Sequence, residues 1–379
     1  MPLRFALIII MCLSLSLTGC WDQNLLKNIT LVLTSSIDQG ENDCVQMSIT
    51  YRKVQQSQGT QQANTGTYIT TVLTTEAPTI RKARTNFSRS VDQKIDLSKM
   101  RVMLIGEEFS KNSLIPHLDM YYRDPKSPLL ANLAVVKGGT PVDVINKLLK
   151  EKLIVSDYLN NLIVTASRVS QVIPGNIQSV RSKMLQTGED FSLPLINMDT
   201  SKELIKIEGV ALFDNGKKTG ELYGMDAILL TIMNNKLGKY ANFTKKITNN
   251  QRLKENNYVT VQVIDSKRTI KILNPDHRHL TVALNFDFTT SVIEYPKDNL
   301  DTREKTDKLN KQLSAILTKD AEKVIAILQQ SNSDILSIGR KYRVQHYDEY
   351  MKMNWVTDYP KVKIIPKIKV NITQTGIIS

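Results

Sequence analysis

The stretch Leu17-Thr18-Gly19-Cys20-Trp21-Asp22 separates two unlike parts of the chain. Before it, residues 5–17 (FALIIIMCLSLSL) are almost wholly apolar, and from Cys20 onward come 360 residues whose mixed polar composition is typical of a folded body. A helix needs about 20 apolar residues to cross a bilayer, so this 13-residue run is too short for a comfortable span. With Arg4 before it and small residues at its end, the run has the pattern of a cleaved secretory signal, which we predict over residues 1–19.

The four residues Leu17-Thr18-Gly19-Cys20 resemble the bacterial lipoprotein signal, Leu-x-Gly-Cys or a close variant. The resemblance implies that Cys20 receives an S-linked diacylglycerol and becomes the first residue of the mature protein, with an N-linked acyl chain on its amino group. Because each buried methylene contributes about 0.8 kcal/mol and two chains hold stably, we expect a water-soluble body anchored to a membrane. The alternative is an ordinary secreted protein that is cleaved near a cysteine by chance.

Composition and charge restrict the partners of this body. The 379 residues are 41% hydrophobic and 23% charged, which is enough for two or three globular domains. The net charge of +13 suits nucleic acid or an anionic membrane surface. An exported lipoprotein does not meet nucleic acid, and the basic residues show no arginine–aromatic pattern of an RNA-binding sheet. We therefore expect an anionic membrane surface or an acidic protein as partner, and no nucleic acid.

The three cysteines predict a body without a disulfide framework. Cys12 is removed with the signal and Cys20 is the candidate for lipidation, so Cys44 remains alone. It lies in an alternating stretch, where we expect a small buried apolar side chain.

The first region, residues 20–200, alternates strand and helix patterns and predicts an α+β domain with a central mixed sheet. Residues 100–105 (MRVMLI) are a buried strand, and Thr140-Pro141-Val142-Asp143 is a well-formed helix start. Ser156 is predicted to begin the next helix, and residues 188–200, which contain Pro194, are predicted to be an irregular linker. The remaining predicted elements are strands at 29–37, 44–51 and 129–136 and helices at 78–91, 107–122 and 176–185.

Two further domains are predicted, a β-rich middle domain over residues 201–275 and a C-terminal α+β domain over residues 276–379. In the middle domain, Asn215-Gly216 between alternating apolar runs predicts a hairpin turn, and strands follow at 258–264 and 268–273. In the C-terminal domain a long helix is predicted over about 302–330, starting at a capping box of Asp301 and Glu304. Its apolar stripe from Leu309 to Leu328 is expected to pack on its own sheet, with a partner helix as the alternative. Strands at 280–292 and 362–372 complete this domain, the last confined by Pro366 to a sheet edge or a bulge.

Few residues suggest a chemical site. His277 and His279 would present both rings on one face of an extended segment and could hold a metal, with Asp276 as the one neighbouring acid. No further ligand lies at suitable spacing, so we interpret them as solvated side chains near a turn. Glu107 and Glu108 are adjacent and need not face one site. No phosphate-binding, nucleophile or zinc motif occurs, and we predict no catalytic, cofactor-binding or metal residues, no cofactor and no enzyme activity.

The run Leu17–Asp22, followed by a strand ending at Ile37-Asp38, resembles the opening of the Ger(x)C family, the C-subunit lipoproteins of spore germinant receptors. Residues 100–106 (MRVMLIG) resemble the first domain of that family, and residues 208–213 (EGVALF) resemble the start of its C-terminal region. The long helix after Asp301 and the closing strand follow the end of the family pattern.

This resemblance implies three α+β domains built on mixed or antiparallel sheets. It implies a non-enzymatic lipoprotein on the outer face of the spore inner membrane in an endospore-forming bacterium, acting with integral membrane A and B subunits to trigger germination in response to nutrients. The only residue whose role it implies is Cys20, the site of lipidation. The alternative is a solute-binding lipoprotein of a transport system, a class that favours two similar lobes around a hinge. The sequence shows no such repeat.

Overall fold

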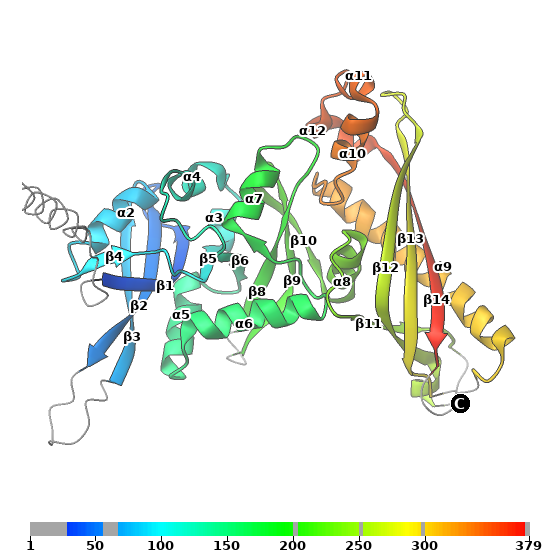
Figure 1. Cartoon of the computed structure of the whole chain (residues 1–379), viewed down its shortest axis with the longest axis horizontal. Helices are drawn as coiled ribbons and strands as arrows, with labels where there is room; N and C mark the ends of the chain where they lie inside the picture. The colour runs from blue at the N-terminus through cyan, green and yellow to red at the C-terminus, as the bar shows by residue number, and fades with distance from the viewer. Residues whose placement is uncertain (1–28, 56–66, 200–203, 250–252, 297–299, 376–379) are drawn as a thin grey trace, which may run out of the picture.

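A computed structural model describes residues 29–55, 67–199, 204–249, 253–296 and 300–375. The molecule is elongated, with β1 and β2 near one end of its longest axis and the last strand, β14, near the other (Figure 1). It is built on two β-sheets, and helices cover both of them. In the part of the chain that is described, no helix combines the length and the apolarity needed to cross a membrane. The predicted signal peptide and Cys20 lie outside the described residues.

The first sheet is mixed and has ten strands, in the order β10-β9-β8-β6-β5-β1-β2-β3, with the short strands β4 and β7 paired to β1 and β6. Strands β1, β5, β6 and β8 are parallel neighbours, and antiparallel strands flank them on both sides. The bounds are β1 (Ile29–Gln39), β2 (Val45–Gln55), β3 (Thr67–Ala77), β4 (Lys94–Asp96), β5 (Val102–Gly106), β6 (Asn132–Lys137), β7 (Gly175–Asn176), β8 (Ser192–Asp199), β9 (Leu204–Asp214) and β10 (Lys217–Tyr223). The predicted α+β class with a mixed sheet is confirmed.

Helices cover both faces of this sheet, which explains the continuous apolar runs of its central strands. In β5, Met103 and Ile105 pack in one hydrophobic cluster with α2, α4 and α7, whereas Val102 and Leu104 point to the other face and pack with α5 and α6. The helices are α2 (Ile80–Phe87), α3 (Glu107–Ser110), α4 (Ile115–Arg123), α5 (Pro141–Lys150), α6 (Val155–Arg168) and α7 (Ile177–Met184).

The predicted linker at residues 188–200 is wrong in its main part, because residues 192–199 form β8 inside the sheet. Pro194 suggested a linker because proline cannot donate a hydrogen bond to a strand ladder. In the structure the ladder from β8 to β6 begins only at Leu195, so Pro194 lies beyond its end. On the other side Pro194 faces Val210 of β9.

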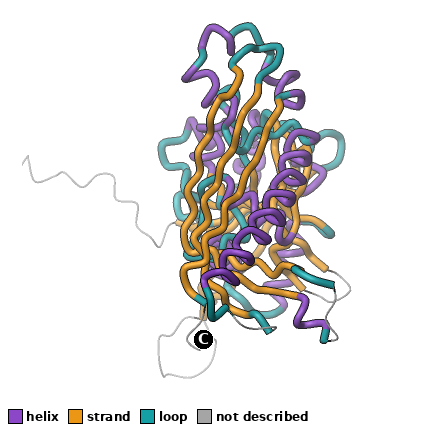
Figure 2. The backbone as a smooth tube through the Cα atoms, turned by 90° about the vertical axis from the view of Figure 1, so that its right-hand side faces the viewer, coloured by secondary structure: helices purple, strands orange, loops and turns teal. Residues whose placement is uncertain are grey.

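The second sheet has four strands in the order β11-β12-β13-β14, and the long helix α9 lies along it (Figure 2). The apolar stripe of α9, from Leu309 to Leu328, is buried with the strands, so the expected packing on its own sheet is confirmed. Pro366 lies in β14, an edge strand as predicted. The bounds are α8 (Gly224–Met233), β11 (Ala241–Lys246), η2 (Lys254–Asn257), β12 (Tyr258–Asn274), β13 (Thr281–Glu294), α9 (Arg303–Gln330), α10 (Ile338–Gln345), α11 (Tyr347–Tyr350), α12 (Trp355–Asp358), η3 (Tyr359–Lys361) and β14 (Lys363–Gln374).

The helix starts test the predicted caps. The capping box of Thr140 and Asp143 is confirmed, with both reciprocal hydrogen bonds present. The predicted cap at Asp301 is wrong by one residue, since the hydroxyl of Thr302 accepts from the Lys305 N–H. Ser156 is also wrong as a cap, because α6 begins at Val155 and Ser156 lies inside its first turn.

Two local predictions concern a turn and a cysteine. The hairpin turn at Asn215-Gly216 is confirmed, because both residues have the positive φ angles (45° and 80°) that join the antiparallel strands β9 and β10. The prediction of a buried Cys44 is wrong: its side chain is partly exposed and its thiol is free, because the residue lies in the turn before β2 rather than within the strand.

Strand pairing crosses both of the predicted domain boundaries. Strands β8 and β9 pair from Ser192↔Leu212 to Asp199↔Leu204, on either side of the predicted boundary at residues 200/201. Strands β12 and β13 form one hairpin, on either side of the boundary at 275/276. The division into residues 20–200, 201–275 and 276–379 stays a prediction.

Candidate functional site

The end of the molecule that lies nearest to Cys20 in sequence is basic. The described chain begins at Ile29, in β1, and the first three residues of β1 pair with β4. Residues 78–101, which contain α2 and β4, carry seven lysine and arginine side chains and only two aspartates. We call this segment the basic segment. It lies at the end of the long axis opposite to β14 (Figure 1).

Some exposed cations of the basic segment have no acidic partner among the residues that the structure describes. Lys82, Arg89 and Lys94 are exposed, and none of them forms an ion pair with another residue that the structure describes. By contrast, Arg84 is half-buried and binds Asp124 at 2.8 Å. The three unpaired side chains are thus available to an anionic surface.

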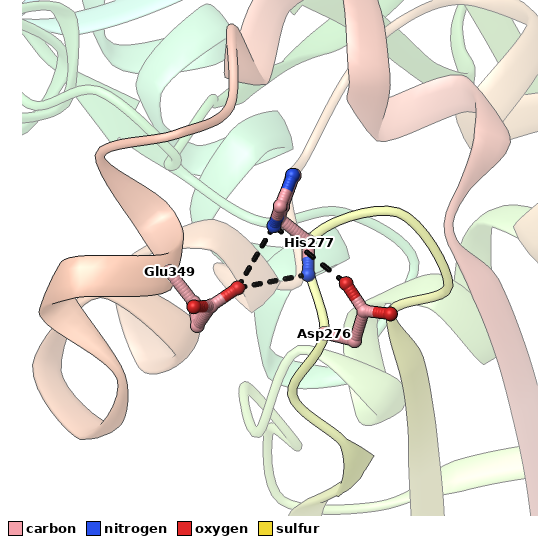
Figure 3. Close-up of side chains that lie close together, drawn as sticks. All are labelled: Asp276, His277 and Glu349. Atoms are coloured by element: carbon pink, nitrogen blue, oxygen red, sulfur yellow. Dashed lines mark hydrogen bonds and ion pairs between the residues drawn. The ribbon is translucent and has the colours of Figure 1, made fainter.

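A cluster of Asp276, His277 and Glu349 joins the tip of the β12–β13 hairpin to α11 (Figure 3). The Nδ1 atom of His277 lies 2.9 Å from Oε2 of Glu349 and 3.6 Å from Oδ1 of Asp276. The backbone N–H of His277 donates to the same Glu349 oxygen at 3.3 Å. We call these three residues the hairpin-tip cluster.

The fold positions both sides of this cluster through contacts that do not involve His277. The buried Tyr342 of α10 donates its hydroxyl to the carbonyl of Pro275 at 2.6 Å, which fixes the hairpin tip against the helices. Asp276 closes the turn, since Oδ1 accepts the Arg278 N–H at 3.0 Å. Glu349 lies on the facing helix, where Lys352 binds its other carboxylate oxygen.

The carboxylates of the cluster are stabilised in their charged form. The pKa of Glu349 is lowered to about 2, mainly by the hydrogen bond from the Lys352 ammonium and to a lesser extent by the hydrogen bonds from His277. The pKa of Asp276 is also lowered, mainly by the hydrogen bond from the Arg278 N–H and less strongly by the one from His279. The Asp276 side chain is 47% exposed, whereas those of His277 and Glu349 are 25% and 30% exposed, so water reaches the cluster from the Asp276 side.

A second constellation joins the two sheets. The loop before β8 and the segment after α9 are linked by paired hydrogen bonds: the Asp334 N–H donates to Oδ2 of Asp190 at 2.8 Å, and the Asp190 N–H donates to the Asp334 carbonyl at 3.1 Å. Burial raises the pKa of Asp190 to about 6 and raises that of Asp334 well above its usual range. Ser333 adds a hydrogen bond to the Phe213 carbonyl. We call this region the domain junction.

The domain junction borders a cavity of about 490 Å³ between the segment at 183–191 and α12. Its wall carries Trp355 and Tyr359, whose aromatic rings contact each other at a tilt of 41°, together with Met351 and Val356. Most of the polar groups in the wall, such as Asp190, are already engaged in the hydrogen bonds of the junction, so the cavity offers mainly apolar contact.

The other residues singled out in the sequence are dispersed. Glu107 binds Lys218 at 2.6 Å and Glu108 binds Lys111 at 2.6 Å, so the two adjacent acids face different partners. His279 contacts Asp276 at the rim of the hairpin-tip cluster, at 3.3 Å. His117 lies far from it, half-buried against Phe109, and this burial lowers its pKa.

Glu349 is the member of the hairpin-tip cluster that sequence reasoning missed. It lies 72 residues from His277, and nothing in the spacing relates the two. The turn residues Pro275-Asp276 and the adjacent His277 were visible in the sequence, but the acid that completes the cluster arrives through tertiary packing.

Comparisons with known proteins agree over almost the whole chain. A family model described as "Spore germination protein N-terminal domain" matches residues 22–198, and one described as "Spore germination B3/ GerAC like, C-terminal" matches residues 208–376. A curated protein of Bacillus subtilis (strain 168), "Putative spore germination protein YfkR", is 27% identical over 210 residues. That alignment covers 52% of this chain and 52% of the relative, so the chain spans about half the length of the curated relative that it matches.

The fold is also similar to a solved structure. The structure named "Crystal Structure of the GerBC protein" aligns with a TM-score of 0.56 and 16% identity, covering 89% of this chain and 96% of that one. At this identity the likeness shows a shared fold.

Proposed function

Because this chain belongs to the Ger(x)C family of spore germination proteins, we propose that it is the lipid-anchored C subunit of a nutrient germinant receptor. In this role it acts with the integral membrane A and B subunits to trigger spore germination, from the outer face of the spore inner membrane. The observation that carries the proposal is the match of both family models, in order, to residues 22–198 and 208–376. The similarity of the fold to GerBC supports it.

The anchor in this proposal is Cys20. This assignment is supported by the run Leu17–Cys20, which resembles a lipoprotein signal. An S-linked diacylglycerol and an N-linked acyl chain on Cys20 would place several acyl tails in the bilayer. Nine residue steps separate Cys20 from Ile29, the first residue of β1 that the structure describes. At no more than about 3.6 Å per residue, this connection keeps the start of β1 within about 32 Å of the anchored cysteine.

The basic segment then faces the bilayer, in our proposal, because it pairs with the start of β1. A basic side chain near an anionic leaflet contributes about 1 kcal/mol, and the contribution falls off within a Debye length. Lys82, Arg89 and Lys94 are exposed and unpaired among the described residues, so they meet the condition for such a contact.

Reversing these three charges (Lys82→Glu, Arg89→Glu and Lys94→Glu together) is expected to weaken binding of the mature chain with Cys20→Ser to phosphatidylglycerol-containing vesicles by at least about tenfold. The Cys20→Ser background removes the anchor, so that vesicle flotation reports the electrostatic contact alone. The matched control reverses Lys363, Lys367 and Lys369, which are exposed on β14 at the other end of the molecule. Equal losses for both triple variants would contradict the assignment of this face.

The role we propose is one of binding and scaffolding, without enzyme activity. It is supported by the family, which is a germinant receptor family and not a known enzyme family. A solute-binding lipoprotein of a transporter would favour two similar lobes, whereas the two sheets here have unlike strand orders.

The receptor role is tested by isolating the chain with its partners. Affinity isolation of the tagged full-length chain from sporulating cells, followed by fractionation, is expected to recover it in the inner-membrane fraction together with two integral membrane proteins. Recovery of a transporter complex instead would support the solute-binding alternative and remove the receptor assignment.

A further inference from the structure

The hairpin-tip cluster has the composition and geometry of a metal site. We propose that Nδ1 of His277 and the carboxylates of Asp276 and Glu349 bind one divalent transition-metal cation of the Zn²⁺ class, with water completing the coordination. This activity goes beyond the receptor role and does not depend on it.

The distances within the cluster fit a single cation. In a tetrahedral site with bonds of about 2.0 Å, the edge between two ligand atoms is about 3.3 Å. The two measured distances from His277 Nδ1, 2.9 Å to Glu349 and 3.6 Å to Asp276, lie on either side of that edge. The three ligand atoms all lie within 4.8 Å of one another. A cation placed between them would bring the two distances toward this tetrahedral edge, and Asp276, which lies farther from His277 than Glu349 does, would move toward the histidine.

The contact between His277 and Glu349 requires either a proton or a cation between its two atoms. Nδ1 and Oε2 are 2.9 Å apart, and each carries a lone pair directed at the other unless a proton or a cation lies between them. With the proton on Nε2, which points away from both carboxylates in Figure 3, Nδ1 is free to be a ligand. A metal then replaces the proton, and imidazole with carboxylates is a ligand set that Zn²⁺ accepts.

The charges around the cluster favour a cation over a simple ion pair. Asp276 and Glu349 bring two negative charges, and the Lys352 ammonium, which binds the Glu349 oxygen that does not face His277, offsets one. His279 touches the outer oxygen of Asp276, where it either shares the negative charge or supplies a further ligand. The Arg278 backbone N–H and the Tyr342 hydroxyl hold the turn in place, so the ligands do not have to be ordered by the metal.

A bound cation would cross-link two elements that are far apart in the sequence. It would tie the tip of the β12–β13 hairpin to α11, next to the exposed side chains of Tyr347 and Met351. The expected effects are metal binding at one site and an increased resistance of the folded chain to heat, because only the folded state brings the ligands together.

The test is calorimetric titration of ZnCl₂ into the full chain, purified in mild detergent without a histidine tag and freed of metal by a chelator. We expect one Zn²⁺ per chain, at least tenfold weaker binding for His277→Ala and for Glu349→Gln, and unchanged binding for His117→Ala, a control histidine remote from the cluster. Lys352→Ala is expected to bind at least as tightly as the unmodified chain, because it removes a competing cation.

A second measurement covers the case in which His277→Ala does not fold. Zn²⁺ should raise the melting temperature of the unmodified chain and of His117→Ala, but leave that of Asp276→Asn and Glu349→Gln unchanged. Binding of equal strength in the unmodified chain and in Glu349→Gln would overturn the proposal. Absence of saturable binding in the unmodified chain would overturn it as well, and would leave the His277–Glu349 contact as a proton-bridged hydrogen bond.

Discussion

Replacing Cys20 by alanine is expected to move the chain from the membrane fraction to the soluble fraction of sporulating cells. The substitution removes the thiol that would carry diacylglycerol, and with it a hydrophobic contribution of about 0.8 kcal/mol for every buried methylene. The electrostatic contribution of the basic segment, about 1 kcal/mol for each contacting side chain, is too small to replace two acyl chains. Quantitative immunoblotting of the two fractions measures the shift.

If the proposed receptor role is correct, the same variant is expected to lose the germination response to one or more nutrients, down to the level of a strain that lacks the gene. The matched control is Cys44→Ala, because Cys44 is a free thiol in the body of the protein and partly exposed. It should stay membrane-bound and support germination. Retention of Cys20→Ala on the membrane, or an unmodified thiol at the mature amino terminus in mass spectrometry, would remove the anchor from the proposal.

The second large effect is expected at the domain junction, for Asp334→Ala. Asp334 is almost fully buried, with 1% of the residue exposed. Its carboxylate accepts hydrogen bonds from the N–H groups of Ile338 at 2.9 Å and Gly339 at 2.7 Å. These are the first N–H groups of α10, whose N-cap residue Ser337 makes no side-chain hydrogen bond to them. Alanine leaves both donors buried without an acceptor, which costs about 3 to 5 kcal/mol of the free energy of unfolding.

The backbone around Asp334 leaves little room to relax after this substitution. A Cβ atom on Gly339 would lie 2.7 Å from the Cα of Gly188 and 2.4 Å from the ring of Trp355, so the two segments already touch. Urea unfolding of the full chain in detergent measures the loss. The control Asp348→Ala removes an exposed aspartate from α11 and should change the free energy of unfolding by no more than about 0.5 kcal/mol. Equal stability of the two variants would show that the carboxylate does not hold α10.

Local sequence patterns predicted the elements whose environment is uniform along their length. The continuous apolar run at 100–105 predicts a buried strand correctly, because helices cover both faces of β5. The apolar stripe of α9 predicts a helix correctly, because one side of that helix packs on a sheet. The continuous strand β12 was predicted as two pieces, 258–264 and 268–273. Its pairing with β13 shifts register between Val263 and Asp265, so the alternation of apolar and polar residues changes phase there.

The candidate sites were less predictable, because each depends on residues far apart in the sequence. Asp190 and Asp334 are 144 residues apart, and His277 and Glu349 are 72 residues apart, so no spacing rule relates either pair. The prediction that His277 and His279 form no metal site rested on the absence of a further ligand at suitable spacing, and the sequence does not show that α11 brings the carboxylate of Glu349 beside His277. Cys20 is different in kind, since its role is implied by a local signal and requires no tertiary contact.

The hairpin of β12 and β13 has the length of a lever arm. At about 3.3 Å per residue, the 17 residues of β12 extend over about 55 Å between the end beside β11 and the tip at Pro275. If the hairpin tilted by about 5° at the end beside β11, its tip would move by about 5 Å, roughly the diameter of a helix backbone. A partner bound at the tip would therefore be displaced by several ångströms when the hairpin tilts by only a few degrees at its other end.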